Sequence, residues 1–571
     1  MANQTPIISF KNFTFRYHTQ AEPTLHDISL DVMPGEKILI VGPSGSGKST
    51  LGHCLNGLIP FSYKGEHTGS LRIAGLEASE QDVFTLSRHV GTVLQDSDGQ
   101  FVGLTVGEDI AFALENDCMD LPQMHARVRQ AAGLVDMEPL LTSSPYELSG
   151  GQKQRTALAG VMINDVDILL FDEPLANLDP ATGKTAIEII DDIHKDTGKT
   201  ILIIEHRLED VLHRPVDRVI VMQEGRIVAD LPPDVLLCGD TLQKSGIREP
   251  LYITALKYAG VKMAPILRPG GIDTIDLSAA KGALAAWMHT AERAAPPELR
   301  PPILELRDIC FAYEPGGKAV LNHVSFTIRQ GEMAAIVGRN GAGKSTLTKL
   351  LCGFEKPVQG SIRYRGEDIA GHTIRERAEY IGLVMQNPNQ MISEAMLAEE
   401  VGLGLKLRGV PEAEREARVK QALAICGLLP FRRWPISALS FGQKKRVTVA
   451  SMLALNPDIL ILDEPTAGQD FKHYTEIMRF LCELNAKGIT VLLITHDMHL
   501  MLEYTPRAIV LSEGELVCDA PASEVLTESG VIERANLRET SLYTLAQRTG
   551  LQDAAGFVQC FIDHERWMRQ Q

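Results

Sequence analysis

Two glycine-rich segments of the chain have the residue types and spacing of a phosphate-binding loop. Residues 42–49 (GPSGSGKS) and 338–345 (GRNGAGKS) both match G-x-x-x-x-G-K-[ST], and each follows an apolar run typical of a buried strand. Glycines let successive backbone N–H groups curl around phosphate oxygens, and the N-terminus of a following helix favours the same anion. The predicted phosphate-binding residues are Gly42, Pro43, Ser44, Gly45, Ser46, Gly47, Lys48, Ser49 and Thr50, and Gly338, Arg339, Asn340, Gly341, Ala342, Gly343, Lys344, Ser345 and Thr346.

The lysines and serines of these segments have separate predicted roles. Lys48 and Lys344 would contact the outer phosphates of a nucleotide, and Ser49 and Ser345 would ligate Mg²⁺. A chance glycine-rich turn is the structural alternative. It is disfavoured because the pattern occurs twice, each time between a predicted strand and a predicted helix.

Two further apolar runs end in the same pair of acids, Asp172-Glu173 and Asp463-Glu464. Buried parallel strands bring such residues to the carboxyl edge of a sheet, where open α/β sheets bind their ligands. Asp172 and Asp463 are predicted to serve Mg²⁺, and Glu173 and Glu464 to polarise an attacking water. An acid that caps the next helix is the structural alternative.

Two histidines and two glutamines also follow predicted strands. His206 ends TILIIEH and His496 ends TVLLITH, positions from which each could hold a terminal phosphate and the nearby glutamate. Gln95 (VGTVLQD) and Gln386 (IGLVMQN) are predicted to contact Mg²⁺ and water. A lone histidine after a strand is more often structural, so these assignments depend on the order of the motifs along the chain.

This order is repeated, which predicts two copies of one domain. Lys48 and Lys344 are 296 positions apart, and His206 and His496 are 290 apart. We predict a first nucleotide-binding domain over 5–245 and a second over 303–530. Between them, 246–302 would form a linker with a helix at 278–294 and a stiff proline-rich spacer at 294–302. Residues 531–571 are predicted to form a helical tail, with Phe557, Phe561 and Trp567 on an apolar face.

Composition excludes several classes of function. The chain has 571 residues, and 56 Lys and Arg against 73 Asp and Glu give a net charge of −17, which disfavours a nucleic-acid partner. The hydrophobic fraction of 44% indicates a soluble globular chain, and no apolar run approaches a membrane span. The N-terminus lacks a secretory pattern. Nine singly scattered cysteines fit a reducing cytoplasm.

The segments LSGGQ at 148–152 and LSFGQ at 439–443 complete the motif set. With them, the chain resembles the ATP-binding cassette ATPases over roughly 5–240 and 303–530. The resemblance implies an α/β fold with two P-loop cassettes in one chain. Each would have a RecA-like parallel-sheet core, an antiparallel β subdomain and a helical signature subdomain. It also implies ATP and Mg²⁺ as ligands.

In that family, two cassettes pair head to tail, and each ATP lies between the phosphate loop of one and the signature of the other. The resemblance therefore adds the signature residues to the nucleotide sites: Ser149, Gly150, Gly151 and Gln152, and Ser440, Phe441, Gly442 and Gln443. Tyr17 and Tyr313 resemble the aromatic residue that stacks on adenine, with ordinary strand aromatics as the alternative. Asp179 and Asp470 resemble the acid that communicates between sites. Phe441 replaces a signature glycine, which predicts some asymmetry between two hydrolytic sites.

Three kinds of cassette protein fit this arrangement: a transporter ATPase, a tandem translation factor on the ribosome, and a tandem sugar-importer ATPase. The short, nearly neutral linker and the acidic chain disfavour the ribosome, and both sets of catalytic residues are intact, unlike those of many sugar importers. Residues 95–116 and 386–406 resemble the energy-coupling factor type of importer.

This resemblance predicts a peripheral protein on the cytoplasmic face of the cell membrane. It would bind a transmembrane coupling subunit and act with a separate substrate-binding membrane subunit. The cargo would be a vitamin, such as a thiamine precursor, or a transition metal such as cobalt. The segments after Gln95 and Gln386 are predicted to dock the membrane partner through exposed apolar residues: Phe101, Val102 and Leu104, and Met391 and Ile392.

Overall fold

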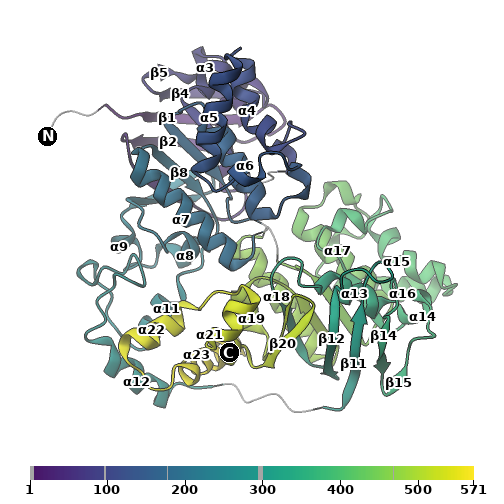
Figure 1. The fold of residues 1–571 in the computed structure, drawn as a ribbon. Helices are drawn as coiled ribbons and strands as arrows, with labels where there is room; N and C mark the ends of the chain where they lie inside the picture. The colour runs from purple at the N-terminus through teal and green to yellow at the C-terminus, as the bar shows by residue number, and fades with distance from the viewer. Residues whose placement is uncertain (1–4, 95–97, 177, 294–299, 467–468, 571) are drawn as a thin grey trace. The chain divides into compact units, whose positions relative to one another are not determined.

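The computed structural model describes residues 5–94, 98–176, 178–293, 300–466 and 469–570, and the side chains of these residues except Asp98, Phe441 and Gln570. Gln95 and most of the proline-rich spacer, residues 294–299, therefore lie outside the described residues. The chain forms two compact units, Met1–Leu284 with Asp470–Lys472, and Ala285–Gln469 with His473–Gln571 (Figure 1).

The first unit is built around a six-stranded sheet in the order β10-β9-β3-β8-β7-β6. All neighbouring strands are parallel except β9 and β10. The strands are β3 (Lys37–Val41), β6 (Val90–Val93), β7 (Ile168–Asp172), β8 (Thr200–Ile204), β9 (Arg218–Gln223) and β10 (Arg226–Leu231). Strands β3 and β8 are buried along their whole length, as expected for a parallel sheet covered on both faces.

A second sheet of the first unit is antiparallel, in the order β2-β1-β4-β5. Its strands are β1 (Ile8–Tyr17), β2 (Leu25–Val32), β4 (Gly65–Ile73) and β5 (Leu76–Glu77). Phe10, Phe13 and Phe15 of β1 pack in one hydrophobic core with Ile38 and Ile40 of β3. The antiparallel sheet is thus fixed to the strand that precedes the first phosphate loop.

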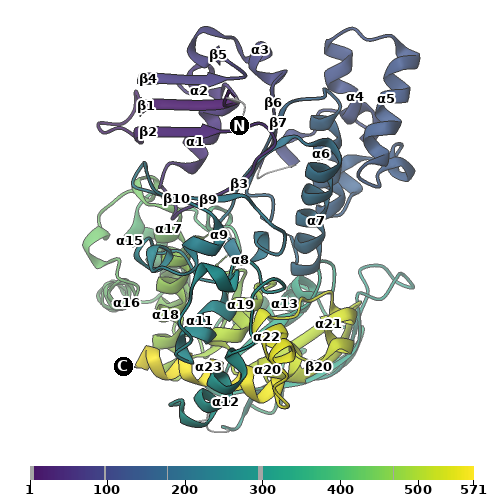
Figure 2. The same ribbon diagram turned by 90° about the vertical axis from the view of Figure 1, so that its left-hand side faces the viewer.

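Helices α4, α5 and α6 pack on one another as a separate layer, and Figure 2 shows α4 and α5 standing apart from the antiparallel sheet. The helices of this part of the chain are α1 (Lys48–Leu55), α2 (Leu58–Phe61), α3 (Val83–Ser87), α4 (Val106–Asn116), α5 (Leu121–Gly133), α6 (Gly150–Met162), α7 (Pro180–Thr197), α8 (Leu208–Val211), α9 (Pro233–Leu236), α10 (Thr241–Lys244), α11 (Leu251–Tyr258) and α12 (Ala280–Thr290).

The second unit repeats this architecture, with a six-stranded sheet in the order β16-β17-β18-β13-β19-β20 and an antiparallel sheet in the order β12-β11-β14-β15. The strands of the six-stranded sheet are β13 (Met333–Val337), β16 (Ile381–Val384), β17 (Ile459–Asp463), β18 (Thr490–Ile494), β19 (Arg507–Ser512) and β20 (Glu515–Ala520). Those of the antiparallel sheet are β11 (Pro302–Phe311), β12 (Leu321–Arg329), β14 (Gln359–Tyr364) and β15 (Glu367–Asp368).

Helices α15, α16 and α17 form the separate helical layer of the second unit. The helices of this part are α13 (Lys344–Cys352), α14 (Ile374–Arg377), α15 (Leu397–Leu407), α16 (Glu412–Ile425), α17 (Phe441–Ala454), α18 (Phe471–Ala486), α19 (Met498–Tyr504), α20 (Ala522–Val525), α21 (Ser529–Ala535), α22 (Ser541–Thr549) and α23 (Ala554–Gln570). The predicted α/β class is thus confirmed in both units: a mostly parallel core, an antiparallel sheet and a helical layer.

The predicted tail helix is present as α23, which packs against α19, α20 and α22. Phe557 and Phe561 are buried, and Trp567 stacks on His564. The helix predicted near 278–294 is α12, and its Trp287 contacts Phe557 of α23 edge to face. The end of the linker is therefore packed on the tail of the second unit.

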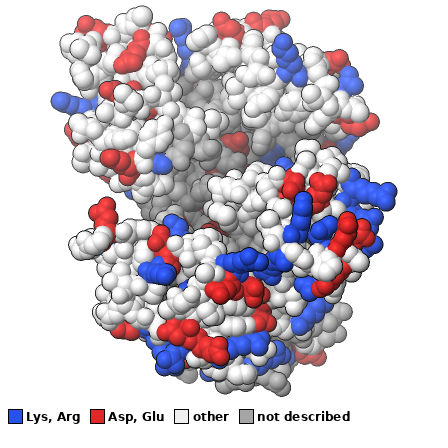
Figure 3. Space-filling view, turned by 90° about the vertical axis from the view of Figure 1, so that its right-hand side faces the viewer, with Lys and Arg blue, Asp and Glu red and all other residues white. Residues whose placement is uncertain are grey.

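In the described part of the chain, none of the helices combines the length and the hydropathy that crossing a bilayer requires. The face drawn in Figure 3 shows Lys and Arg interspersed with Asp and Glu.

Candidate functional site

Each phosphate loop follows a buried strand and ends in the first turn of a helix, α1 in the first copy and α13 in the second. Gly45 and Gly47 have φ angles of 76° and 98°, a left-handed region that favours glycine. A Cβ on Gly42 would lie 2.4 Å from the carbonyl oxygen of Met222. The glycines therefore allow both the turn and the close approach of β9.

The two lysines of the loops make the same contacts in both copies. The ammonium of Lys48 donates to the carbonyl oxygens of Gly42 at 2.8 Å and Pro43 at 3.0 Å. Lys344 donates to Gly338 at 2.7 Å and Arg339 at 2.9 Å. Each ammonium thus lies inside the curve of its own loop, and burial lowers the pKa of Lys48.

The paired acids stand at the carboxyl ends of β7 and β17, as predicted. The registers pair Asp172 with Ile204 and Asp463 with Ile494, the last residues of the neighbouring strands β8 and β18. The pKa of Asp172 and that of Asp463 are each raised to about 6, mainly by burial and secondly by the negative charge of the adjacent glutamate.

The residues present fit a divalent cation. Oδ1 of Asp172 is buried and has no hydrogen-bond partner among the described residues. A carboxylate whose negative charge is poorly compensated suits a hard, oxygen-seeking cation such as Mg²⁺. Ser49 and Ser345 are exposed in the first turn of their helices, where their hydroxyl groups are accessible to a ligand.

The glutamates and histidines meet in each copy. Nε2 of His206 lies 2.8 Å from Oε1 of Glu173, and Nδ1 of His496 lies 2.6 Å from Oε1 of Glu464. Burial is the largest single influence on the pKa of Glu173 and raises it, but the hydrogen bond with His206 and the positive charges of His206, Lys48 and Arg207 together lower the net pKa. Both glutamates have a positive φ, 51° and 46°, a conformation that costs a non-glycine residue free energy and occurs often at functional sites.

The signature residues begin helices α6 and α17. Ser149 Oγ accepts the backbone N–H of Gln152, and the Gln152 side chain accepts the N–H of Ser149. Ser440 and Gln443 make the same reciprocal pair. Such a capping box fixes an exposed helix N-terminus, which is a favourable position for an anion. The side chain of Phe441 lies outside the described structure.

The remaining predicted residues are placed on several elements. The hydroxyl groups of Tyr17 and Tyr313 lie 3.1 Å from Thr50 and Thr346, at the start of the phosphate-loop helices. Asp179 caps α7, Asp470 directly precedes α18, and Gln386 is exposed two residues after β16.

The segments expected to dock a partner are only partly exposed. Val102 and Leu104 are 63% and 80% exposed. Phe101 is buried, and Met391 and Ile392 pack against the core of the second unit. The prediction of exposure was therefore wrong for these three, because an apolar residue in a loop does not reveal which way its side chain points.

Acidic residues in the first turns of α4 and α15 have a structural role. Asp109 Oδ1 accepts the N–H groups of Val102 and Gly103, and Glu108 Oε2 accepts those of Leu104 and Thr105. In the second copy, Glu400 Oε2 accepts the corresponding backbone N–H groups of Ser393 and Glu394. These carboxylates hold each loop against the first turn of its helix.

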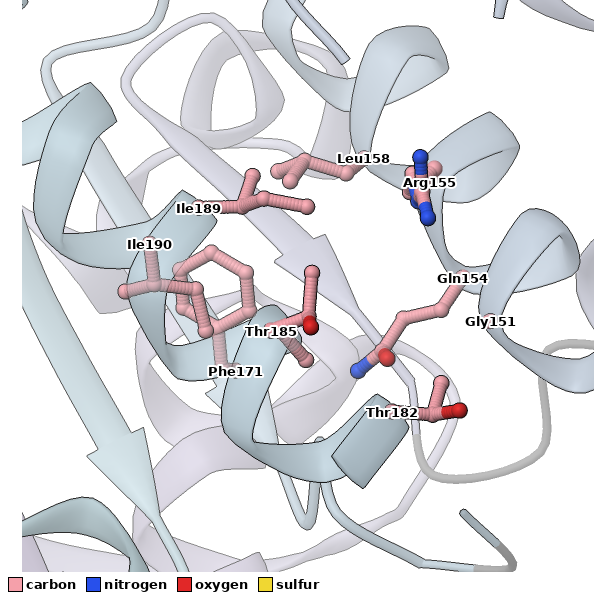
Figure 4. Close-up of a pocket in the computed structure, with 10 residues that line it drawn as sticks. Gly151, Gln154, Arg155, Leu158, Phe171, Thr182, Thr185, Ile189 and Ile190 are labelled. Carbon is pink, nitrogen blue, oxygen red and sulfur yellow. The ribbon is translucent and has the colours of Figure 1, made fainter. Parts of the chain in front are cut away.

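A pocket lies between α6 and α7 of the first unit (Figure 4). Leu158, Phe171, Ile189 and Ile190 form its apolar wall. Gln154 extends from α6 toward Thr182 of α7. The pocket therefore lies behind the signature helix and next to the strand that carries Asp172.

Sequence reasoning missed two buried charged residues beside the glutamates, Glu205 and Lys445. Both are at most 4% exposed and contact the backbone around the catalytic segments. The other copy has a neutral residue at each position: Thr495 corresponds to Glu205, and Gln154 corresponds to Lys445. Aligning the two copies residue by residue would have revealed both differences.

The fold and the two motif sets define a P-loop ATPase with two cassettes in one chain. Comparison with family models agrees: the model described as "ABC transporter" matches residues 25–176 and 321–467. A model described as "ATP-binding cassette cobalt transporter" matches 239–311, and one for an AAA domain matches 432–503, within the second cassette.

Full-length relatives carry the identification further. Proteins of Clostridium perfringens and Enterococcus faecalis are 54% identical over 563 residues and 55% identical over 564 residues, and both alignments cover 99% of each chain. Each is named "Putative ABC transporter ATP-binding protein". The chain therefore belongs to the family of ABC transporter ATP-binding proteins and is an ABC-type ATPase. A solved chain, described as cbiO1 of Clostridium perfringens and as part of the ABC transporter complex cbiONQ, is 35% identical, covers 44% of this chain and 99% of its own, and gives a TM-score of 0.39.

Proposed function

We propose that this ATPase energises a membrane importer of the energy-coupling factor type, acting at the cytoplasmic face of the membrane. The cargo would be a transition metal such as cobalt, with a vitamin such as a thiamine precursor as the second candidate. The observation that carries the proposal is the match of residues 239–311 to the cobalt-transporter model, because this segment lies entirely between the two cassette matches. A tandem translation factor is disfavoured because the full-length relatives are named as transporter proteins.

The nucleotide chemistry would use both copies. In the pairing that the family resemblance implies, one ATP lies between the Lys48 loop and the Ser440 signature, and the other between the Lys344 loop and the Ser149 signature. Lysines and glycine N–H groups would hold the phosphates, and Ser49, Asp172, Ser345 and Asp463, with Gln95 and Gln386, would hold Mg²⁺. When bound, Mg²⁺ neutralises phosphate charge.

The hydrolytic step would depend on one glutamate and one histidine in each copy. Glu173 and Glu464 would accept the proton of the attacking water, since each carboxylate lies at a strand end next to its phosphate loop. His206 and His496 would keep the carboxylates in place through the hydrogen bonds at 2.8 and 2.6 Å. Positioning and electrostatic stabilisation supply most of the catalysis in phosphoryl transfer.

The test is purification of the tagged chain from membranes of its native host, with identification of co-purifying proteins. We expect a transmembrane coupling subunit and a small substrate-binding membrane protein. The complex in proteoliposomes should take up radiolabelled cobalt in an ATP-dependent way. Uptake of a thiamine precursor instead would revise the cargo, and sedimentation with ribosomes without membrane subunits would refute the proposal.

We further propose that the loop containing Val102 and Leu104 contacts the coupling subunit. Both side chains are largely exposed although they are apolar, and the loop backbone is held by Asp109 and Glu108. Val102→Asp with Leu104→Asp is expected to reduce recovery of the membrane subunits at least about tenfold, because a buried unpaired charge is costly in an interface. ATP binding by the isolated chain should persist.

Val358→Asp is the matched control for this prediction. Val358 is 75% exposed and directly precedes β14, in the antiparallel sheet of the second unit, which contains neither docking segment. Its replacement should leave recovery unchanged. Normal recovery with the double variant would show that the loop around Leu104 is not a docking surface.

A further inference from the structure

In both copies a buried charged residue holds the short segment that follows the catalytic glutamate, but the two residues come from different elements. In the first copy this residue is Glu205, which follows β8 and precedes His206. In the second copy it is Lys445, which lies on α17, the helix that begins at the signature. The buried charge near Glu173 thus comes from the histidine loop, and the one near Glu464 comes from the signature helix.

Glu205 is 3% exposed and joins two loops. Its Oε2 accepts the N–H of Leu175 at 3.1 Å, and Oε1 accepts the N–H groups of His206 at 2.7 Å and Arg207 at 3.2 Å. The guanidinium of Arg207 in turn donates to the carbonyl oxygen of Leu175 at 2.7 Å. Leu175, two residues after Glu173, is therefore held on both sides by the loop that carries the histidine.

The second copy has no carboxylate at the corresponding position, because Thr495 precedes His496. The Thr495 hydroxyl donates to Oε2 of Glu464 at 3.2 Å and accepts the N–H of Asp497 at 2.9 Å. Thr495 thus contacts the glutamate side chain itself. Of the backbone contacts that Glu205 makes, it reproduces the one to the residue two positions on, because Asp497 corresponds to Arg207.

Lys445 supplies the backbone contact in the second copy. It is 4% exposed, and its ammonium donates to the carbonyl oxygens of Glu464 at 2.9 Å and Pro465 at 2.7 Å. The corresponding residue of the first copy is Gln154, whose neutral amide donates to the carbonyl oxygen of Pro174. Figure 4 shows this side chain extending from α6.

Buried charges are costly unless hydrogen bonds satisfy them, and hydrogen bonds to a charged group are roughly twice as strong as neutral ones. The backbone groups bound by Glu205 and Lys445 are therefore fixed more firmly than neutral side chains would fix them. Since a shift of about 1 Å in a reacting group can cost a factor of about 10² in rate, such anchors affect catalysis without touching the substrate.

We propose that Glu205 and Lys445 are positioning residues for Glu173 and Glu464, and that they make the two hydrolytic sites mechanically different. Glu205 couples Glu173 to the histidine loop of its site, whereas Lys445 couples Glu464 to the signature helix of its own cassette. The inference depends on the proposed hydrolytic role of the two glutamates.

The experiment measures each site separately in the full chain. The Glu464→Gln background reports on the first site, and Glu173→Gln reports on the second. In the first background, Glu205→Gln is expected to lower kcat about tenfold and Glu205→Thr by more, with the KM for ATP within about twofold. Glutamine keeps one acceptor oxygen and should therefore rescue part of the loss. In the second background, Lys445→Gln is expected to lower kcat about tenfold at an unchanged KM.

Lys444→Gln and Glu80→Gln are matched controls, because Lys444 is the half-exposed neighbour of Lys445 and Glu80 is an exposed carboxylate. The melting temperature of every variant is measured to confirm that it folds. If Glu205→Thr does not fold, Glu205→Gln alone tests the role of Glu205. An unchanged kcat in folded Glu205→Gln and Lys445→Gln, or a rise in KM with an unchanged kcat, would overturn the inference. Hydrolysis at the wild-type rate in both parent backgrounds would instead refute the proposed role of the glutamates.

Discussion

Replacing Glu173 and Glu464 together by glutamine is expected to lower ATP hydrolysis by a factor of about 10² to 10⁴, the usual contribution of a general base. Glutamine has nearly the same shape as glutamate but cannot take a proton from water. The backbone at each position is held independently of the side chain, since the N–H groups of Glu173 and Glu464 donate to Ile204 and Ile494 at 2.8 Å.

ATP binding by this double variant should stay within a few-fold of the parent, because neither substitution touches Lys48, Lys344 or the glycines of the loops. Phosphate release measures hydrolysis, and the rise in melting temperature with added ATP measures binding. Glu80→Gln with Glu367→Gln, both at exposed positions, is the control for loss of two carboxylates. Hydrolysis at the parental rate would show that neither glutamate is the base.

Asp172→Asn with Asp463→Asn should make the nucleotide-free protein more stable while abolishing Mg²⁺-dependent hydrolysis. Each carboxyl has a pKa of about 6 in the folded state, compared with about 4 when unfolded, so the folded protein binds these protons more tightly. The resulting stabilisation of the folded state is complete below about pH 4 and is lost as the pH rises through 6. By pH 7.5 the free energy of unfolding has lost about 3 kcal/mol per group.

Asparagine removes the buried charge but keeps a polar group, so we expect a gain of about 1–3 kcal/mol per site at pH 7.5. The readout is the melting temperature without nucleotide in the presence of a chelator, at pH 7.5 and pH 5. At pH 5 the gain should shrink to about half, since the parental carboxyls are then mostly protonated in the folded state. Asp192→Asn, at an exposed position of α7, is the control. A lower melting temperature at pH 7.5 would show that the carboxylates stabilise the empty site.

The positions of the motifs could be predicted because they depend on order along the chain. A buried run such as KILIV must lie in the sheet, and the residues that follow its end must lie at the carboxyl edge. Glu173 and His206 were therefore expected to come close, because each follows the end of a predicted strand. The glutamate–histidine contacts of both copies follow from that reasoning.

Contacts that depend on side-chain direction could not be predicted in this way. Phe101 lies next to the exposed Val102 but is itself buried. Nothing in the sequence around these two residues shows which side chain points inward and which points outward. Glu205 looks like an ordinary polar residue between a strand and a histidine. Its role depends on the loop after β7, which is 30 residues away in sequence.

The lysine contacts inside the phosphate loops also bear on how substitutions of these lysines are to be interpreted. Each ammonium binds two carbonyl oxygens of its own loop, so the lysine helps to fix the curve of the loop. A phosphate oxygen that replaces these carbonyls exchanges neutral acceptors for a charged one, and hydrogen bonds between charged groups are roughly twice as strong. Removing a lysine would therefore loosen the loop as well as remove a phosphate contact, so weaker nucleotide binding in such a variant would combine both effects.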